Sequence, residues 1–398
     1  MKICFIGKYP PIEGGESSKL YWLARGLGDK GHIIHVVTNA LEVENEYREK
    51  ICENIDLDSY QPNNVYIHNT NPFLDLQFIP FNNPYIAKLA NLSIEVIRNY
   101  NLQIIDSWYI LPYCISGYIA KIFTHKPQIL RHAGSDLNRL FFNRDLNTIF
   151  TEIIKAADIV VTYTSRLKQF IELGVSESNI FMNKKVSVNP EFFNPNVKPI
   201  DLSKFKKFNP RYPVITYIGK FGYTKGIIEL LFVLSQIKQN FNLLLVTGGK
   251  NLNILKKIIN EYKLSPKTII IGFVPPWKIP SIIKASTCVV HAENEFPISS
   301  HSPILPYEVM AVGSCLVLSE ELYKKRKSEK IKNKENIIVV NPKNTENFKN
   351  IIQSIIENPN IAEKIGKAAN KISLQIEDFE NYITQTEYLY ESALKRQK

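Results

Sequence analysis

The chain has 398 residues, of which 44% are hydrophobic and 22% are charged. This length is too great for one ordinary α/β core and suits two domains, and the composition excludes wholesale disorder. Five cysteines without pairing or ligand spacing exclude a disulfide-rich scaffold and indicate reduced core thiols. The formal charge of +11 requires anionic partners, and ligand phosphates, anionic lipid and nucleic acid are all candidates.

Hydropathy and the placement of charges restrict the cellular compartment and the classes of binding partner that the sequence suggests. The apolar run at the N-terminus is too short for a signal peptide, and no stretch approaches the roughly 20 apolar residues that span a bilayer. We therefore expect a cytoplasmic protein. Lysines concentrate at 204–207 and 324–334, in segments typical of solvated loops. Nucleic acid is not an expected partner because no binding motif is present, whereas peripheral contact with the inner face of an anionic membrane stays open.

The first half alternates apolar, β-branched runs with longer segments of helical period, which predicts a parallel sheet with helices on both faces. Strands are expected at Lys2–Ile6, Ile33–Thr38, Ile104–Ser107, Gln128–Arg131 and Ile159–Tyr163. A helix is expected from Ser17 to Lys30, because its apolar residues share one face and Gly31 is a frequent C-terminal stop.

Gly14 and Gly15 lie in the loop between the first strand and this helix. Glycines at such a turn let the backbone approach a phosphate or a sugar closely, and a helix N-terminus favours negative charge. Glycine serves folding at such turns as often as ligand binding, so both interpretations stay open. No GxGxxG pattern follows and no acidic residue ends the second strand, so a dinucleotide coenzyme is not expected.

Two polar motifs follow in the first half. The acidic triplet at 56–58 resembles a metal-binding pattern, but it lies in a polar insertion with no strand after it, so no metal site is expected. RHAGSD, at 131–136, places His132 at the carboxyl end of a predicted strand, where parallel sheets bind their ligands. His132 is therefore a candidate catalytic residue, and a hydrogen-bonded structural histidine is the alternative.

A proline-rich segment at 189–213 separates the two halves. It has five prolines and no apolar period, which is typical of a linker. We place the first domain at 1–195, the linker at 196–213, the second domain at 214–375 and a C-terminal helix at 376–398.

The second half repeats the pattern of the first. ICFIGKY at 3–9 and ITYIGKF at 215–221 each place a strand and then Gly-Lys-aromatic at the start of a half. This repeat predicts two Rossmann-like, doubly wound parallel-sheet domains in tandem, with an interdomain cleft. After the strand that begins at Val214, strands are expected at Leu243–Val246, Thr268–Ile271, Thr287–His291, Ser314–Leu318 and Asn336–Val340.

The loop after the first strand of the second half is GKFGYTKG and carries Lys220 and Lys225. Two ammonium groups and a helix N-terminus at such a turn can stabilise a diphosphate leaving group without a divalent metal. Both lysines are therefore candidate catalytic residues. The alternative is that they are two exposed lysines on a loop.

The segment 291–319 contains a short predicted helix, PYEVMAV, between Pro306 and Gly313. Proline suits the first helical position and glycine the C-terminal stop. Glu308 lies in the first turn, where a carboxylate can accept two hydrogen bonds from ribose hydroxyls or can simply pair with the helix dipole.

The last segment, about 361–396, has helical period and several aromatic residues. A helix of this length needs a surface to pack on. We expect it to return to the first domain, and a cap on the second domain is the alternative.

PPIEGG, RHAGSD, YIGKFGYTKG, IIGFVPP and PYEVMAVG occur in the order and approximate spacing of retaining glycosyltransferases of family 4, which have the GT-B fold. The resemblance spans nearly the whole chain. It implies a nucleotide-sugar donor on the second domain, with the base against backbone near Gly272 and Phe273 and the ribose on Glu308. It also implies that Lys220 and Lys225 hold the diphosphate.

The same resemblance implies roles for the first domain. Gly14 and Gly15 would approach the diphosphate or the acceptor, and His132 would face the donor sugar near its anomeric carbon. The departing phosphate would itself deprotonate the incoming hydroxyl. Transfer would retain the anomeric configuration and would require no metal or other cofactor.

One departure from the family concerns its first glutamate. That residue contacts the sugar eight positions before the ribose-binding glutamate, but Ser300 stands there in this chain. Ser302 lies in the altered loop and is grouped with the expected donor-binding residues. Either Glu293 or Glu295 reaches the sugar from this loop, or the sugar is held differently.

Together these features predict a retaining, metal-independent glycosyltransferase that moves a sugar from a nucleotide-diphosphate sugar to a glycan or lipid-linked acceptor. Surface polysaccharide or glycolipid synthesis is the expected setting. A nucleotide-sugar epimerase or a sugar phosphorylase would share the fold and is one alternative. A non-catalytic, two-lobed sugar-binding protein is the other, although it would not need a cationic diphosphate turn.

Overall fold

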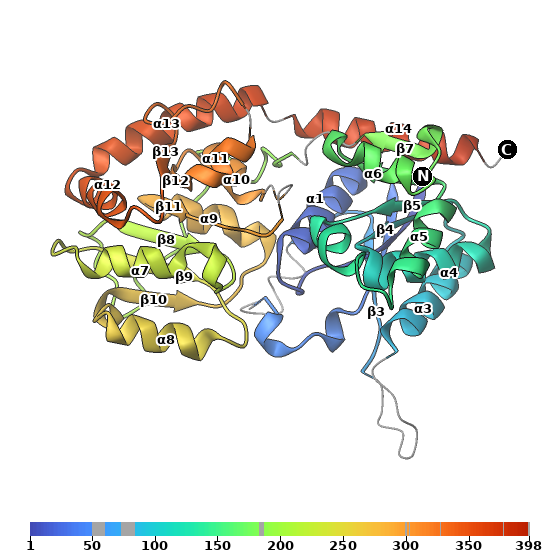
Figure 1. Cartoon of the computed structure of the whole chain (residues 1–398), viewed down its shortest axis with the longest axis horizontal. Coiled ribbons are helices and arrows are strands. Elements are labelled where there is room, and N and C mark those ends of the chain that lie inside the picture. The colour runs from blue at the N-terminus through green and yellow to red at the C-terminus, as the bar shows by residue number, and fades with distance from the viewer. Residues whose placement is uncertain are drawn as a thin grey trace, which may run out of the picture. The chain divides into compact units, whose positions relative to one another are not determined.

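The structure is a computed structural model, and it describes residues 1–49, 60–72, 84–182, 187–298, 301, 303–326, 328–376 and 378–396. The acidic triplet at 56–58, Ser300 and Ser302 lie outside the described residues. The chain divides into an N-terminal unit (1–44, 52–186 and 380–398) and a C-terminal unit (45–51 and 187–379). Each unit is built around its own parallel sheet (Figure 1).

The N-terminal unit holds a 7-stranded sheet in the order β3-β2-β1-β4-β5-β6-β7. Its strands are β1 (Lys2–Ile6), β2 (Ile33–Thr38), β3 (Val65–Asn69), β4 (Ile104–Trp108), β5 (Gln128–Arg131), β6 (Ile159–Thr162) and β7 (Ile180–Met182). All neighbouring strands are parallel. The central strands are buried on both faces, which explains their nearly continuous runs of Ile and Val.

Helices pack on both sides of this sheet (Figure 1). They are α1 (Gly15–Asp29), α3 (Tyr85–Asn99), α4 (Ile115–Thr124), α5 (Asn147–Ala156), α6 (Leu167–Glu172) and α14 (Phe379–Lys395). Two short helical turns, η3 (Ile110–Cys114) and η4 (Asp136–Leu140), follow β4 and β5 at the carboxyl edge of the sheet.

The C-terminal unit holds a 6-stranded sheet in the order β10-β9-β8-β11-β12-β13. Its strands are β8 (Val214–Ile218), β9 (Asn242–Val246), β10 (Thr268–Ile271), β11 (Cys288–His291), β12 (Cys315–Ser319) and β13 (Ile338–Val340). Its helices are α7 (Ile227–Ser235), α8 (Leu252–Glu261), α9 (Ile279–Lys284), α10 (Leu305–Val312), α11 (Glu320–Arg326), α12 (Thr345–Glu357) and α13 (Pro359–Ile376). Leu230, Leu243, Val290 and Ile352 belong to one buried core that joins α7 and α12 to the sheet.

In both sheets the strand order reverses at the first strand. β1 lies between β2 and β4, and β8 lies between β9 and β11. The connections that follow β1 and β4, or β8 and β11, therefore leave the carboxyl edge of the sheet in opposite directions. Parallel sheets of this order bind ligands at such a switch point, so the loops after these strands are the first place to look for a site.

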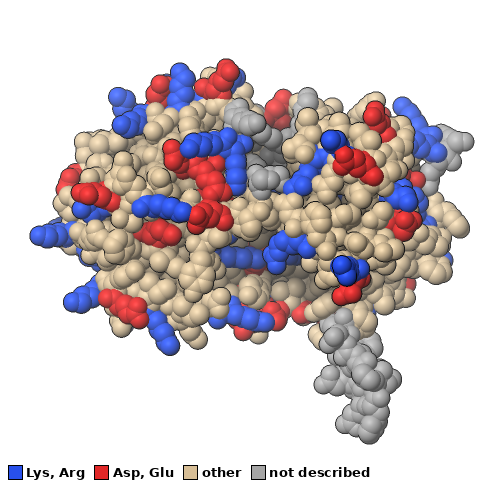
Figure 2. Space-filling view, in the orientation of Figure 1, with Lys and Arg blue, Asp and Glu red and all other residues tan. Residues whose placement is uncertain are grey.

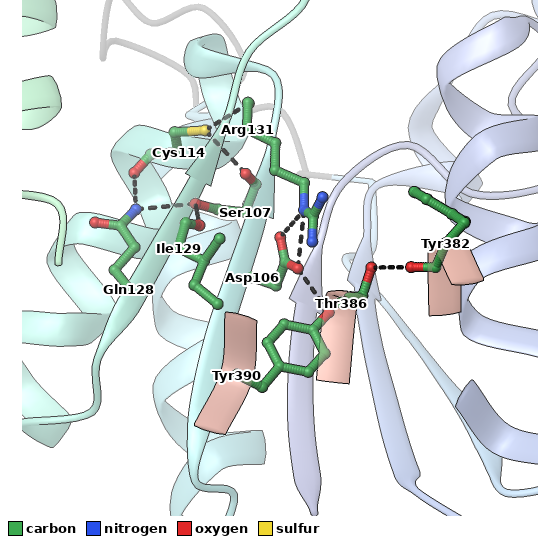
Figure 3. A network of polar contacts seen from close by, with 9 residues as sticks. All are labelled: Asp106, Ser107, Cys114, Gln128, Ile129, Arg131, Tyr382, Thr386 and Tyr390. Atoms are coloured by element: carbon green, nitrogen blue, oxygen red, sulfur yellow. Dashed lines mark hydrogen bonds and ion pairs between the residues drawn. The ribbon is translucent and has the colours of Figure 1, made fainter. Parts of the chain in front are cut away.

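The C-terminal helix α14 packs on the N-terminal unit (Figure 3). Tyr390 Oη donates to Asp106 Oδ2 at 2.7 Å, and Arg131 Nε donates to both oxygens of the same buried carboxylate at 2.9 and 3.0 Å. Near the start of the helix, Glu380 lies 2.6 Å from Lys30 Nζ. These charge-assisted contacts hold the helix on the sheet that the first part of the chain forms.

The two edge strands of the N-terminal sheet, β3 and β7, were not predicted from the sequence. β3 has a single buried residue and β7 has three half-buried ones, so neither presents a strong apolar run. The long helix expected at the C-terminus is two helices, α13 and α14, and the first helix begins at Gly15 rather than Ser17. The other predicted strands are confirmed to within two residues at each end.

The surface carries its charges in a mixed arrangement. On the face shown in Figure 2, basic and acidic side chains are interspersed. None of the helices in the described part of the chain is both long and apolar enough to cross a membrane.

β2 and β3 carry a pair of stacked histidines. His35 Nδ1 and His68 Nε2 lie 2.9 Å apart, and the His35 ring also stacks on Tyr66 and lies tilted against Tyr100. Burial, with smaller contributions from His68 and Lys2, lowers the pKa of His35 to about 4. His35 is therefore neutral in the folded protein at neutral pH.

Acidification is expected to destabilise the fold through His35. A histidine in an unfolded chain has a pKa of about 6.5, so between about pH 6.5 and 4 the unfolded state binds a proton that the folded state does not. The free energy of unfolding should fall as the pH drops through this window, by up to about 1.4 kcal/mol per pH unit from this residue. Urea unfolding at several pH values measures the slope, which His35→Gln should reduce. His125→Gln, which changes an exposed histidine, is the control, and an equal slope in both variants would contradict the prediction.

Candidate functional site

The loops after β8 and β11 meet at the switch point of the C-terminal sheet. After β8 the chain forms a short turn, η7 (Tyr223–Lys225), and Gly226 then adopts a φ of 69°. A Cβ atom on Gly226 would lie 2.0 Å from the carbonyl oxygen of Ala292, so only glycine permits this approach. Asn294 N donates to Thr224 O at 3.0 Å and ties the two loops together.

Lys225 is held at this junction by a buried glutamate. Its ammonium pairs with Glu293 Oε2 and lies 4.0 Å from the centroid of the Phe296 ring. The Glu293 side chain is only 1% exposed, and its other oxygen lies 3.1 Å from His301 Nε2. Lys225 is therefore held in place by two direct neighbours, Glu293 and Phe296, rather than extended freely into solvent.

The charge of Glu293 is set by competing effects. Burial raises the pKa of its carboxyl, but the hydrogen bond with His301 and the charge of Lys225 outweigh it and lower the pKa to about 2. Glu293 is therefore ionised at neutral pH. Its charge partly offsets that of Lys225 and orients the ammonium, which has three N–H donors and can bind an anionic ligand as well as Glu293.

Glu293 and Glu295, the two glutamates proposed from the sequence as possible sugar contacts, have different surroundings in the structure. Glu293 lies inside, against Lys225, whereas the Glu295 side chain is 69% exposed and pairs with Lys343. Glu295 also has a positive φ of 54°, which turns the chain sharply after β11. Glu293 is thus the glutamate of this loop that lies against Lys225, and whether Glu293, Glu295 or neither contacts the donor sugar stays a prediction.

Lys220 has different partners from Lys225. Its ammonium lies 5.7 Å from the centroid of the Tyr47 ring, and its carbonyl oxygen accepts a hydrogen bond from Tyr217 Oη at 2.7 Å. Tyr47 comes from a first-half segment that belongs to the C-terminal unit. Nothing in the sequence indicated this placement, because the segment has neither a strand nor a helix period.

Glu308 lies in the first turn of α10 and is 5% exposed. The helix ends at Gly313, whose φ of 79° provides the predicted C-terminal stop. α13 supports it from the side: Asn370 Nδ2 donates to Ala311 O at 2.7 Å, and a Cβ on Gly366 would lie 2.2 Å from Gly313 O. The predicted helix is confirmed, and its C-terminal end packs closely against α13.

Gly272 and Phe273 follow β10 at the same edge of the sheet. The Phe273 ring is 7% exposed and packs over Gly248 in the loop after β9, where a Cβ would approach it to 2.9 Å. The side chain therefore fills the interior, and a ligand would meet the backbone of this segment rather than the ring.

Residues 200–372 match the family model of glycosyl transferases group 1. N-acetyl-alpha-D-glucosaminyl L-malate synthase from Bacillus anthracis is 22% identical over 66% of this chain and 66% of its own length. An uncharacterized glycosyltransferase from Methanocaldococcus jannaschii is 24% identical over 99% of each chain. Among solved structures, Anabaena HepE in complex with UDP-glucose aligns with a TM-score of 0.69 at 17% identity, over 98% of this chain and 100% of that one.

The family match falls on the unit that carries Lys225 and Glu308. The predicted GT-B architecture is confirmed by the two parallel sheets and by the alignment with HepE over its whole length. The same match supports the predicted glycosyltransferase class. Membership of family 4 and retention of the anomeric configuration stay predictions.

In the N-terminal unit, Gly14 and Gly15 lie where α1 begins. Gly14 has a φ of 117°, and a Cβ on either glycine would meet no atom within 4 Å. The space beside the helix N-terminus is therefore open within this unit. Glu16 and Lys19 form an ion pair of 2.8 Å in the first turn.

His132 lies directly after β5 and is half-buried. Its Nε2 is 2.9 Å from Thr162 Oγ1 at the end of β6, and its ring lies 5.1 Å from that of Phe170. Burial lowers the pKa of His132 to about 4, and the charge of Arg166 contributes in the same direction. At neutral pH the imidazole is therefore neutral and can act as a hydrogen-bonding group, not as a cation.

No group of three or more His, Cys, Asp or Glu side chains gathers into a metal site among the residues that the structure describes. Metal independence stays a prediction that requires an assay.

Proposed function

We propose that this chain is a retaining glycosyltransferase that moves a sugar from a nucleotide-diphosphate sugar to a hydroxyl acceptor. The observation that carries the proposal is the placement of Lys225, which Glu293 and Phe296 fix at the β8/β11 switch point. A fixed cation can neutralise a departing diphosphate without reorganising during the reaction. The family match over 200–372 supports the same class of reaction.

The donor is proposed to lie along the carboxyl edge of the C-terminal sheet. Lys220 and Lys225 neutralise the diphosphate, and Glu308 accepts hydrogen bonds from the ribose hydroxyls. The backbone at Gly272 and Phe273 meets the base. HepE is solved with UDP-glucose, so UDP-sugars are the first donors to test.

The N-terminal unit is proposed to supply the sugar and acceptor contacts. The neutral imidazole of His132 hydrogen-bonds the donor sugar, and the open space at Gly14 and Gly15 admits the diphosphate or the acceptor. The departing phosphate takes the proton from the acceptor hydroxyl as the new glycosidic bond forms on the face from which it leaves. A glycan or a lipid-linked glycan is the proposed acceptor.

A thermal-shift screen with nucleoside diphosphates and their sugars tests the donor assignment. A ligand at 100 times its Kd adds about 2.7 kcal/mol of apparent stability, so one nucleotide should raise the melting temperature clearly above the others. Lys225→Met should remove that increase, and Lys343→Met, at an exposed ion pair of the same unit, should keep it. Binding of a free sugar without affinity for any nucleoside diphosphate would favour a non-catalytic sugar-binding protein instead.

A further inference from the structure

Asp136 is a fully buried carboxylate next to the loop that carries His132. One of its oxygens, Oδ2, accepts two backbone hydrogen bonds, from Ala133 N at 2.9 Å and from Ile110 N at 3.1 Å. Ala133 follows His132 in the loop after β5, and Ile110 begins η3 after β4. The side chain therefore joins the loops that follow two neighbouring strands.

Two further contacts tie the same loops together. Tyr109 N donates to Arg131 O at 2.9 Å, and Tyr109 Oη lies 2.8 Å from Ser135 Oγ. Tyr109 adopts a positive φ of 78°, which is strained for an aromatic residue. The surrounding bonds hold it there, which shows how closely the geometry of these loops is determined.

The second carboxylate oxygen of Asp136, Oδ1, has a different environment from Oδ2. Oδ1 is buried and has no hydrogen-bond partner within the described ranges, so the ionised form is incompletely solvated. Burial raises the pKa of Asp136 to about 7, although the two backbone hydrogen bonds act in the opposite direction. The titratable or charged groups that interact with it are Lys8, Glu16, Tyr109 and Cys114; Arg139 acts on Tyr109, and His132 precedes Ala133 in the same loop.

We propose that Asp136 is a positioning residue for His132, and that its ionised carboxylate fixes the Ala133 N–H and so holds the adjacent imidazole in its working position. Protonation replaces charge-assisted hydrogen bonds by weaker neutral ones and loosens both loops. The rate of sugar transfer should then follow the ionisation of Asp136. This inference rests on the proposed function, because it takes His132 to contact the donor sugar.

The pH dependence separates Asp136 from His132. The pKa of His132 is about 4, so the imidazole stays neutral between pH 6 and 8 and cannot itself cause a change in rate there. A carboxyl with a pKa near 7 is mostly protonated at pH 6 and mostly ionised at pH 8. The kcat of the wild-type enzyme should therefore rise about tenfold over this interval.

Asp136→Asn is the test of this dependence. The amide oxygen can still accept both N–H bonds but does not titrate, so kcat should become nearly independent of pH between 6 and 8, while the KM of the donor changes little. Asp158→Asn is the matched control. Asp158 Oδ2 also accepts from a backbone amide, Gln128 N at 2.7 Å, but at the opposite end of β5. Asp158→Asn should keep the wild-type increase in kcat between pH 6 and 8. The same increase in Asp136→Asn would overturn the proposal.

Amide hydrogen exchange tests the two hydrogen bonds that Asp136 accepts without requiring turnover. In the wild-type protein, the protection of the Ala133 and Ile110 amides, corrected for the intrinsic pH dependence of exchange, should increase severalfold from pH 6 to pH 8. Equal protection at both pH values would overturn the proposal, and this measurement decides even if Asp136→Asn fails to fold. If amide protection depends on pH in a protein that turns over no nucleotide sugar, the role of the Asp136 hydrogen bonds is supported and the proposed function is contradicted.

Discussion

Lys225→Ala is expected to lower kcat for sugar transfer by about 100- to 1000-fold, the usual loss when one preorganised group that stabilises developing charge is removed. The lysine lies in the turn after β8, and its ammonium is fixed by Glu293 and Phe296. In the proposed reaction, negative charge accumulates on the diphosphate as the sugar leaves. Steady-state kinetics with the donor found by thermal shift measures the effect, and a variant with the wild-type kcat would remove the site assignment.

A loss of stability must be separated from this loss of catalysis. Lys225→Ala leaves the buried Glu293 without its cation, and breaking a buried ion pair costs about 3 to 5 kcal/mol. The double variant Lys225→Met, Glu293→Gln removes both charges and should recover most of the stability. Because it still lacks the ammonium, its kcat should stay low. Recovery of both stability and kcat would mean that the single variant failed through its fold.

Glu308→Ala is expected to lower kcat/KM for the donor by roughly 100-fold or more. Hydrogen bonds to charged groups contribute about 1.5 to 3 kcal/mol each, and the proposed carboxylate accepts two of them from the ribose. Glu308 is 5% exposed in the first turn of α10, so its carboxylate is largely shielded from water. Glu320→Ala, on the partly exposed face of α11, is the control and should behave as wild type.

A modified donor makes the Glu308 assignment specific to the ribose. A nucleotide sugar that lacks the 2′-hydroxyl should be a much poorer donor for the wild-type enzyme, since the carboxylate is then left with one bond fewer. Glu308→Ala should discriminate little between the two donors. Equal discrimination by wild type and variant would place the ribose elsewhere, even if the variant has low activity.

The periodicity of the sequence determined the two sheets. Central strands of a parallel sheet are buried on both faces, so they appear as β-branched runs that local analysis detects, as at Ile33–Thr38 and Asn242–Val246. The short helix that contains Glu308 could also be predicted from the sequence, because proline and glycine have strong local preferences at helix ends. The edge strands of the N-terminal sheet could not be predicted from the sequence, because β3 and β7 are only half-buried and carry no such pattern.

The candidate site was determined only in part by the sequence. A glycine-flanked turn after a strand was enough to select Lys225, since backbone geometry and position in a parallel sheet follow from local rules. Sequence could not choose between Glu293 and Glu295, because the direction of the loop depends on the contact of Gly226 with Ala292, 66 residues away. It also gave no sign that Tyr47 joins the C-terminal unit.

Tertiary structure alone decided the contacts between distant segments. A helical period shows that the C-terminal segment has an apolar face, but not which surface covers it, and the bond from Tyr390 to Asp106 spans 284 residues. The double hydrogen bond of Asp136 likewise requires Ile110 and Ala133 to be brought together from two loops. Local backbone preferences depend on neighbours in the chain and can be inferred from the sequence. Side-chain burial and the ionisation of buried groups depend on neighbours in space, which are set only when the chain has folded.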